Sequence, residues 1–143
     1  MKNSYQKGKD GEKQSDLYLK KFGFVRPAPD KRKNIAQEYK KVGLLINPKG
    51  FDLIKKEEID NPLPTLYESK TAGADRRTLI GENWKGFGFT LTSAEEENAH
   101  ILGEKYKFIW LDLKKQDHKI LHLGDFLTEE KARIYYTKSV FIK

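Results

Sequence analysis

Three charged residues in the middle of the chain stand inside apolar stretches, where a charge is unexpected. Asp52 lies in one such stretch, and Glu68 and Lys70 lie in the next, 66–70. Successive side chains of a strand point to opposite faces, so Glu68 and Lys70 share a face. If the two stretches form a hairpin centred near Asp60, Asp52 lies opposite Glu68. Directly paired residues have Cβ atoms about 5 Å apart.

Two carboxylates this close repel each other unless a cation lies between them. Mg²⁺ fits, because it is bound by one or two carboxylates together with waters and phosphate oxygens. A bound metal polarises a phosphoryl oxygen and lowers the pKa of a bound water. The Lys70 ammonium can orient that water or stabilise charge in the transition state. We therefore interpret Asp52 and Glu68 as metal ligands, and Lys70 as the third member, of a site that hydrolyses phosphodiesters.

The short pattern of an acidic residue, any residue and a lysine has little value by itself. It occurs five times in the chain, and we interpret four of these as solvated charges. Glu68 and Lys70 differ because an apolar strand leads into them and Asp52 lies at hairpin distance. The five pairs are Glu38–Lys40, Glu68–Lys70, Asp112–Lys114, Asp117–Lys119 and Glu129–Lys131.

A fourth candidate residue, and a third carboxylate, is Glu12, which belongs to a helix predicted over 10–22, with Asp10 as its N-cap and Gly23 as its stop. Glu12 shares a helical stripe with Leu19 and Phe22, which are expected to face the core. Glu12 either joins the site, directly or through water, or is a favourable charge in the first helical turn.

The composition suits a basic, single-domain protein. The chain has 143 residues, a formal net charge of +7, 34% charged residues and no cysteine. A basic surface attracts polyanions, because neutralised phosphates release their counterions. The lack of cysteine excludes disulfides and thiolate zinc sites. We expect one nuclease domain over 1–143 with a frayed 1–9, no membrane segment and a cytoplasmic location.

The remaining pattern alternates strands and helices, which predicts an α/β fold with a mixed central β-sheet flanked by α-helices. Prolines and basic residues indicate a loop over 27–33, and 35–46 is ambiguous between helix and strand. A capping box that begins at Thr92 predicts a helix over 93–102, whose Glu95, Glu96 and Glu97 we interpret as helix-dipole partners. Strands are predicted over 51–55, 66–70, 106–113, 119–123 and 134–142, a long loop over 71–88 and a short helix over 128–133.

Several of these segments resemble a known group of nucleases. Gly50-Phe51-Asp52 followed by Glu68-Ser69-Lys70 resembles the PD-(D/E)XK nuclease superfamily. The segment 9–12, with Leu19 to Phe24, is similar to the first helix of archaeal Holliday-junction resolvases. The segment 89–95, with Ala99 and 103–106, looks like the nuclease-like domain of the plant protein NO VEIN. Phe51 stands where the superfamily motif has proline.

The resemblance implies a restriction-endonuclease-like fold with a four-stranded mixed sheet, Mg²⁺ dependence and products with a 5′-phosphate. It also implies that Asp52 and Glu68 bind the metal and that Lys70 is the catalytic lysine. In the resolvases a helix glutamate joins the metal site, and Glu12 is the matching position. Some members of the superfamily have lost activity.

Two groups of basic residues are candidates for DNA contact. Arg76, Arg77 and Lys85 lie in the long loop after the predicted catalytic strand, where they could reach the backbone or base edges. Lys31, Arg32 and Lys33 form a second, weaker candidate. Either group could instead be a solvated charged loop. Trp110 is expected in the core, whereas Trp84 suits either the core or base stacking.

The sequence thus predicts a Mg²⁺-dependent DNA endonuclease of restriction type, whose recognition loops surround the active site. A homodimer would supply two active sites for cutting double-stranded DNA. The same size suits a Holliday-junction resolvase acting on branched DNA. A non-catalytic nucleic-acid-binding protein of the same fold is the alternative from another class, and RNA stays open as a substrate.

Overall fold

The protein, represented here by a computed structural model, has a mixed α/β fold, as predicted. The structure describes residues 4–72, 81–128, 131–134 and 139–143. Its helices are α1 (Ser4–Lys20), α2 (Pro29–Lys41) and α3 (Ser93–Leu102). No helix in these described ranges combines the length and the apolar character needed to cross a membrane. The strands are β1 (Phe24–Val25), β2 (Ile54–Lys55), β3 (Leu66–Ala72), β4 (Gly88–Thr90), β5 (Tyr106–Asp112), β6 (Asp117–Leu121), β7 (Ala132–Ile134) and β8 (Ser139–Ile142).

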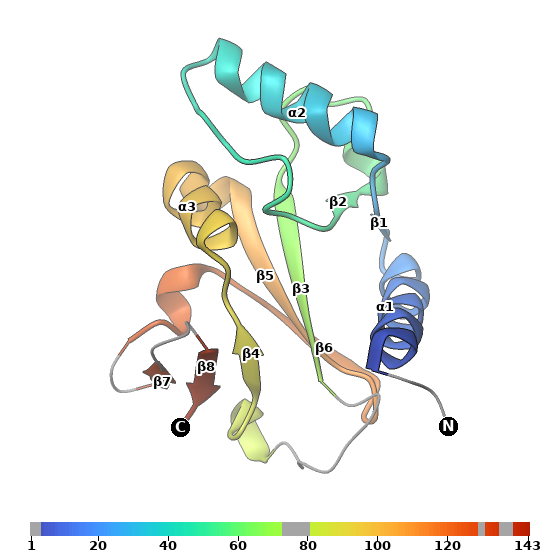
Figure 1. Ribbon diagram of the computed structural model, residues 1–143, viewed down its shortest axis with the longest axis vertical. Helices are drawn as coiled ribbons and strands as arrows, with labels where there is room; N and C mark the ends of the chain where they lie inside the picture. Colours follow the sequence, from blue (N-terminus) through green and yellow to red (C-terminus); the bar gives the residue numbers. More distant parts are fainter. Residues whose placement is uncertain (1–3, 73–80, 129–130, 135–138) are drawn as a thin grey trace.

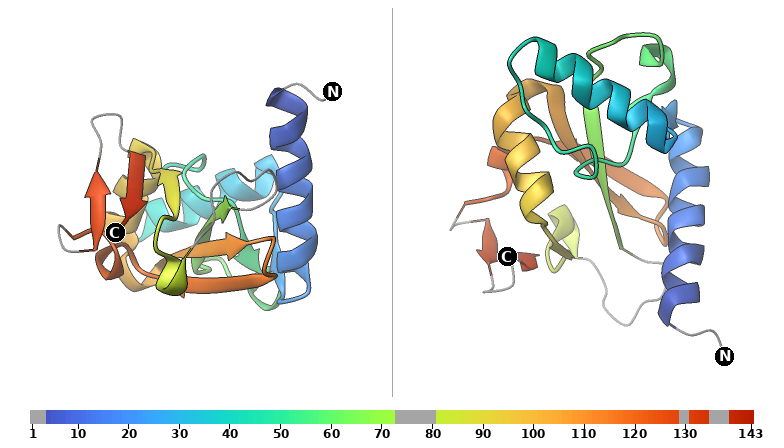
Figure 2. Two further views of the ribbon diagram at one scale, coloured as in Figure 1. Left: turned by 90° about the horizontal axis from the view of Figure 1, so that it is seen from below. Right: turned by 45° about the horizontal axis from the view of Figure 1, so that its top comes forward.

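The central sheet has the strand order β3-β5-β6, in which β3 runs parallel to β5 and β6 runs antiparallel to β5. Two small antiparallel sheets, β1-β2 and β4-β8-β7, complete the strands. Figures 1 and 2 place α1 on one side of the central sheet, and α3 and β4-β8-β7 on the other. The central strand β5 is buried along almost its whole length because both of its faces are covered.

Alternation along β3 and β5 divides the apolar side chains between two clusters. Ile109 and Tyr67 pack against Leu19 of α1 in the smaller cluster. Phe108 and Leu66 belong to the larger cluster, which includes residues of α3 and β4-β8-β7. Glu68 and Lys70 follow Leu66 at strand spacing, so they lie on the face of the larger cluster. The sheet therefore directs the predicted catalytic pair toward α3 and β4 and away from α1.

The first helix is longer at its start than predicted. α1 begins at Ser4, so the predicted N-cap at Asp10 is wrong and lies inside the helix. The predicted stop is confirmed: the helix ends at Lys20, and Gly23 follows with a φ of +86°, a conformation that glycine adopts without strain.

The loop predicted over 27–33 is wrong, because α2 begins at Pro29. Proline is well accommodated in the first turn of a helix, where its missing N–H is not needed. Asp30 in the same turn complements the helix dipole. The prolines therefore signalled a helix start, and the basic residues that follow lie on a helix.

The capping box at Thr92 is confirmed. The Thr92 hydroxyl accepts from the Glu95 backbone amide, and the Glu95 carboxylate accepts from the Thr92 amide. Strand β5 also lies where it was predicted. The predicted helix over 128–133 is wrong at its end, because Ala132 begins β7. Shorter strands replace the predictions over 51–55 and 134–142, and the strand predicted over 119–123 begins and ends two residues earlier, as β6; residues 73–80, 129–130 and 135–138 lie outside the described ranges.

Candidate active site

The predicted pairing between the Asp52 and Glu68 segments is confirmed at one bridge. Leu53 and Tyr67, equally far from residue 60, exchange two backbone hydrogen bonds of 2.9 Å. The Asp52 amide donates to the same Tyr67 carbonyl, also at 2.9 Å. Two successive amides on one carbonyl form the pattern of a β-bulge, which re-aims a side chain. The Asp52 carboxylate accepts from the Ser69 amide at 3.1 Å, so it lies across β3 beside Glu68.

Glu68 is the most buried acidic group of the site, with 5% of its surface exposed. Burial raises the pKa of the Glu68 carboxyl well above its usual value, because the charged form loses its hydration. A hydrogen bond with the Asp52 side chain and repulsion from Asp52 and Glu95 raise this pKa further. Lys70 opposes the shift and lowers the pKa. The two carboxylates therefore lie together without full compensation by the cations around them.

Lys70 points from the same face of β3 into contact with α3. Its ammonium donates to the Glu95 carboxylate at 2.6 Å and to the Thr90 carbonyl at 2.7 Å. Only 12% of the Lys70 side chain and 10% of the Glu95 side chain are exposed. A pair this close and this buried is screened little by solvent, so Glu95 fixes the position of Lys70.

Glu95 is the site residue that the sequence interpretation missed. Its role at the helix N-terminus is confirmed, but the same carboxylate also binds Lys70. The available signal was its place in the capping box: a glutamate held at the start of a helix has a fixed direction. The missing information was that the turn before α3 crosses the end of β3.

Arg26 was also missed, and it gathers three carboxylates at the edge of the site. Its guanidinium forms a two-pronged pair with Asp16 at 2.9 and 3.0 Å. It lies 3.4 Å from Asp52 and 3.5 Å from Glu12. The hydrogen bond with Asp16 raises the pKa of Arg26. Arg26 thereby neutralises part of the charge on Asp52 and links α1 to the site.

Glu12, predicted as a fourth site residue, lies next to this arginine. Its side chain is 57% exposed, and it forms an ion pair with Arg26 at 3.5 Å. The structure therefore brings Glu12 to the rim, where Arg26 connects it to Asp52. A place in the first turn of α1 is excluded, because that helix begins at Ser4.

Arg32, predicted as a weaker candidate for DNA contact with a solvated charge as the alternative, makes contacts within the protein. Its guanidinium donates to the carbonyls of Phe51 at 2.6 Å and Asp52 at 3.2 Å, and it lies over the Phe51 ring. Burial lowers the pKa of Arg32, and the charge of Asp52 opposes that shift. Arg32 thus holds the backbone that carries Asp52, while Lys31 is half-buried and Lys33 exposed on the same helix.

Of the other predicted DNA contacts, Arg76, Arg77 and Lys85, only Lys85 lies among the described residues. Lys85 is exposed at the end of a short 3₁₀ turn, Glu82–Trp84, that precedes β4. Arg76 and Arg77 lie outside the described residues. Trp84 packs against the larger core cluster, and Trp110 is buried in it, as predicted.

The loop before Asp52 is fixed from behind by α3 and β5. Asn98, which is fully buried, donates to the Gly50 carbonyl at 3.1 Å, and the Tyr106 hydroxyl donates to the same oxygen. A Cβ built on Gly50 would lie 2.5 Å from the Asn98 amide nitrogen and 2.8 Å from the Ala94 carbonyl oxygen. Only glycine fits there, so α3 sets the position of the turn that leads to Asp52.

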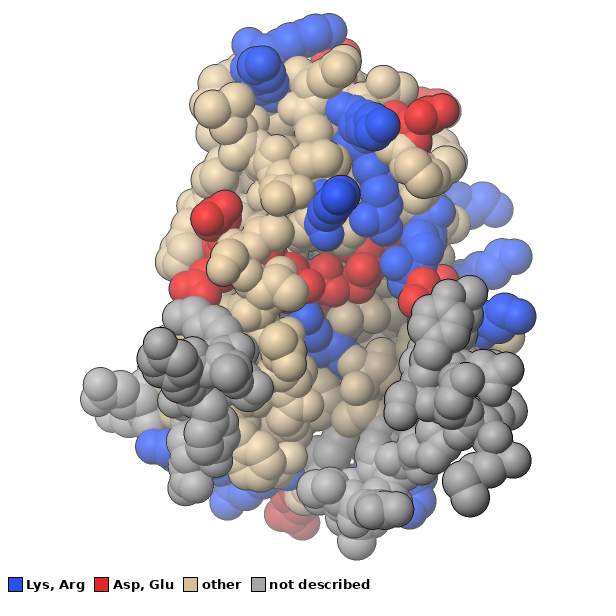
Figure 3. Space-filling view, in the orientation of Figure 1, with Lys and Arg blue, Asp and Glu red and all other residues tan. Residues whose placement is uncertain are grey.

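Acidic and basic side chains are separated on the face of the molecule shown in Figure 3. Figure 3 shows a band of acidic side chains across the middle of the face, with basic side chains above it and a basic group below. Glu68 interacts electrostatically with both Asp52 and Glu95. A cation would be attracted to the acidic band, and a polyanion to the basic groups around it.

The paired carboxylates fit a magnesium ion, although the chain offers few ligands. Among the described residues, no group of three or more histidine, cysteine, aspartate or glutamate side chains is arranged to hold a metal. Mg²⁺ needs only one or two carboxylates and takes its remaining ligands from waters and phosphates. Asp52 and the buried Glu68 supply that pair, and a divalent cation would supply the compensation that they lack.

Comparisons with known proteins add no assignment. The chain matches no family model, no curated protein and no solved structure. The site therefore rests on its own geometry.

Proposed function

We propose that this protein is a magnesium-dependent endodeoxyribonuclease whose active centre is formed by Asp52, Glu68 and Lys70. The observation that carries the proposal is the adjacency of the Asp52 and Glu68 carboxylates, with Lys70 two residues further along the same face. The net charge of +7 favours a polyanionic substrate. The resemblance to PD-(D/E)XK nucleases and the mixed α/β fold agree with this assignment.

In this proposal Asp52 and Glu68 hold Mg²⁺, which when bound polarises the scissile phosphate and acidifies a water. Lys70 donates hydrogen bonds to a phosphate oxygen or to the attacking water, and it stabilises the charge that develops. Glu95 and the Thr90 carbonyl keep the Lys70 ammonium in place before substrate arrives. Arg26 at the rim balances the charge of Asp52.

The biological form we propose is a cytoplasmic restriction-type enzyme that works as a homodimer. Double-strand cleavage needs two active centres, and two copies of a chain this size would provide them. Recognition would then come from loops around the site and from Lys31, Lys33 and Lys85. The exposed or half-exposed positions of these lysines support that role.

The decisive experiment is cleavage of plasmid, genomic and four-way-junction DNA with Mg²⁺, by wild type and by Lys70→Ala. We expect discrete DNA fragments from the wild type, no fragments in EDTA, and at least a hundredfold loss of rate in Lys70→Ala, on the order of the effect of one catalytic group. Lys114→Ala is the matched control, because it removes the lysine of another acidic-x-lysine pattern. There Asp112 accepts from the Lys114 and Lys115 amides in a turn.

Each other outcome points to a different protein. Symmetric nicking of the junction alone would identify a resolvase. Binding of DNA without cleavage of any substrate would identify a non-catalytic module. Cleavage that survives Lys70→Ala would show that the wrong residues have been assigned, and preferential cleavage of an RNA control would change the substrate.

A further inference from the structure

A pocket lies on the same face of the central sheet as Lys70. Lys70 of β3, Trp110 of β5 and Lys119 of β6 are register partners across the three strands. They form one row, because paired residues of neighbouring strands project to the same face. Neighbouring strands lie about 4.8 Å apart, so the strand positions of Lys70 and Lys119 are about 10 Å apart. The pocket is therefore close to the proposed active centre but distinct from it.

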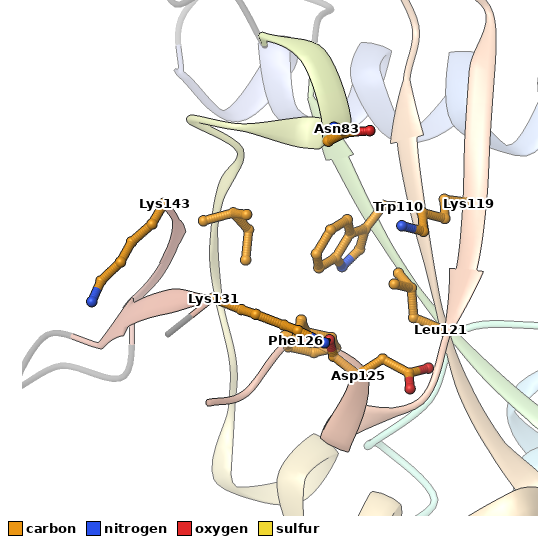
Figure 4. A pocket seen from close by; sticks show the side chains of 9 residues that line it. Asn83, Trp110, Lys119, Leu121, Asp125, Phe126, Lys131 and Lys143 are labelled. Carbon is orange, nitrogen blue, oxygen red and sulfur yellow. The ribbon is translucent and has the colours of Figure 1, made fainter. Parts of the chain in front are cut away.

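The pocket has a volume of about 260 Å³, apolar walls and a basic rim. Leu121, Phe126 and Ile142 line it beside Trp110, and Lys119 and Lys131 reach it from opposite sides. In Figure 4 the Lys119 side chain extends from β6 toward the indole, and Lys131 lies along Phe126. The remaining lining residues are Asn83, Asp125 and Lys143.

Its most informative feature is a buried donor that lacks an acceptor. Trp110 is 3% exposed, and within the described ranges no acceptor lies in hydrogen-bond reach of its indole Nε1–H. Figure 4 shows this nitrogen on the edge of the ring that faces Phe126 and Leu121. A buried donor without a partner costs about 1–3 kcal/mol. Because the Nε1 atom itself has almost no exposed surface, a ligand in the pocket can supply the acceptor only when a neighbouring side chain moves aside.

The arrangement of the lining side chains, from the buried end of the pocket to its rim, indicates the chemistry of a ligand. A neutral N–H deep among aromatic and aliphatic side chains suits the carbonyl oxygen of a flat ring. Lysines at the rim suit an anion attached to that ring. Lys131 is held at the rim, because its ammonium donates to the Asp125 carbonyl at 3.1 Å. A nucleotide has both parts in this order, a base with carbonyl acceptors and a phosphate.

We propose that this pocket binds one unpaired nucleotide, whose base accepts from Trp110 and whose phosphate lies between Lys119 and Lys131. The inference rests on the proposed function, since it makes the nucleotide part of the nuclease substrate. A span of about 10 Å corresponds to roughly three nucleotides of a stacked strand at 3.4 Å each. The pocket would thus hold a nucleotide displaced from its stack near the scissile phosphate.

The test is a titration of the ¹⁵N-labelled protein followed by NMR, because the two tryptophans give two indole N–H signals. Trp84→Phe identifies the Trp110 signal. Thymidine 5′-monophosphate, thymidine and inorganic phosphate are each added to millimolar concentration. We expect a saturable shift of the Trp110 signal with the monophosphate, and much weaker effects of thymidine or phosphate alone. Lys119→Ala combined with Lys131→Ala should weaken binding about tenfold or more, whereas Lys114→Ala should leave it unchanged.

Three results would overturn the proposal: no shift with any compound, equal binding of inorganic phosphate, or equal binding by the double variant. The Trp84 signal reports folding in each of the lysine variants. This titration involves no cleavage, so it fails independently of the nuclease assignment. Plasmid cleavage without binding of the monophosphate would refute only the nucleotide-pocket proposal. Binding without cleavage would refute only the nuclease assignment.

Discussion

At the scale of single residues, identical chemical groups have different functions because their partners differ. The Glu68 carboxylate is buried beside Asp52, whose negative charge repels it. The Glu95 carboxylate is almost as buried, but it has a lysine and a helix N-terminus as partners. The first arrangement attracts a cation. In the second, the Glu95 carboxylate already has Lys70 and the Thr92 amide as partners. Only the first suits a metal ligand.

The raised pKa of Glu68 predicts a pH-dependent stability. A carboxyl whose folded-state pKa exceeds its unfolded value stabilises the fold below the unfolded pKa, about 4.3, and this contribution is lost as pH rises through the folded pKa. Glu68→Gln cannot ionise. In EDTA we expect similar stabilities near pH 4 and a variant more stable than wild type at pH 8, by about 1–3 kcal/mol. Urea unfolding at both pH values measures the difference.

The same variant has a built-in metal control. At pH 8, Mg²⁺ should raise the stability of the wild type, because an ion that binds only the folded state stabilises it. Glu68→Gln should gain much less. Equal stability of both proteins in EDTA at pH 8 would contradict the uncompensated burial of Glu68.

Glu95→Gln tests whether Glu95 positions Lys70. Glutamine keeps an oxygen acceptor for the Thr92 amide and for Lys70 but removes the charge opposite a buried ammonium, so the unfolding free energy should fall by about 1–3 kcal/mol. The lost charge frees the lysine ammonium, and we expect kcat to fall about tenfold or more with little change in KM. Glu96→Gln is the neighbouring control. A change in KM alone would indicate a substrate contact instead.

Sequence reasoning reached the Asp52–Glu68 pairing because two apolar strands around a proline turn leave few registers. It could not reach Glu95 or Arg26. Their contacts depend on how the start of α3 and the strand after α1 approach β3, and no local pattern encodes such approaches. Arg32 shows the opposite error, since a run of basic residues concealed an arginine directed inward.

At the scale of elements, α3 controls the site twice. Its first turn holds Lys70 through Glu95, and its middle holds the turn before Asp52 through Asn98. The helix itself was predictable, because a capping box marks its start. The short strands β1, β2 and β7 were not predictable with correct bounds, because each of them depends on a partner distant in sequence.

Gly50→Ala tests the contact between α3 and the Asp52 turn. The new Cβ would overlap the Asn98 side chain and the Ala94 carbonyl, so one of them must move. We expect a loss of about 1–3 kcal/mol in unfolding free energy, with lower cleavage activity because Asp52 is displaced. Gly124→Ala is the matched control, since a Cβ there meets no atom within 4 Å. Thermal unfolding of both variants gives the comparison, and equal stabilities would contradict close packing at Gly50.

At the scale of the whole molecule, one sheet separates two kinds of surface. Its α1 face is closed by an apolar cluster. Its other face has Glu68, the row of Lys70, Trp110 and Lys119, and the pocket lined by Trp110. The predicted α/β class is confirmed. It could be predicted because strand and helix periodicities alternate along the chain. The division of the charges between faces could not be predicted, because it depends on the assembled sheet.

The basic residues of α2 provide a test of how the whole surface meets DNA. Lys31→Ala with Lys33→Ala should reduce the slope of log affinity against log salt by about 2, because each lost phosphate contact removes about 0.9. Their effect on stability should be small, since Lys33 is exposed and Lys31 half-exposed. Arg32→Lys should instead lower stability and leave the slope unchanged, because an ammonium lacks the planar fork of donors with which the guanidinium reaches the Phe51 and Asp52 carbonyls.

We therefore expect Arg32→Lys to unfold at lower temperature, by the equivalent of about 1–2 kcal/mol, with an unchanged salt slope. Fluorescence anisotropy with a DNA duplex in EDTA, across a salt series, measures the slope without cleavage. Lys114→Ala shows how much of the effect follows from net charge alone. An unchanged slope in the double variant would remove α2 from the DNA-binding surface and leave recognition to the loop that contains Lys85. A lower slope in Arg32→Lys would mean that its guanidinium leaves the Asp52 turn to contact DNA.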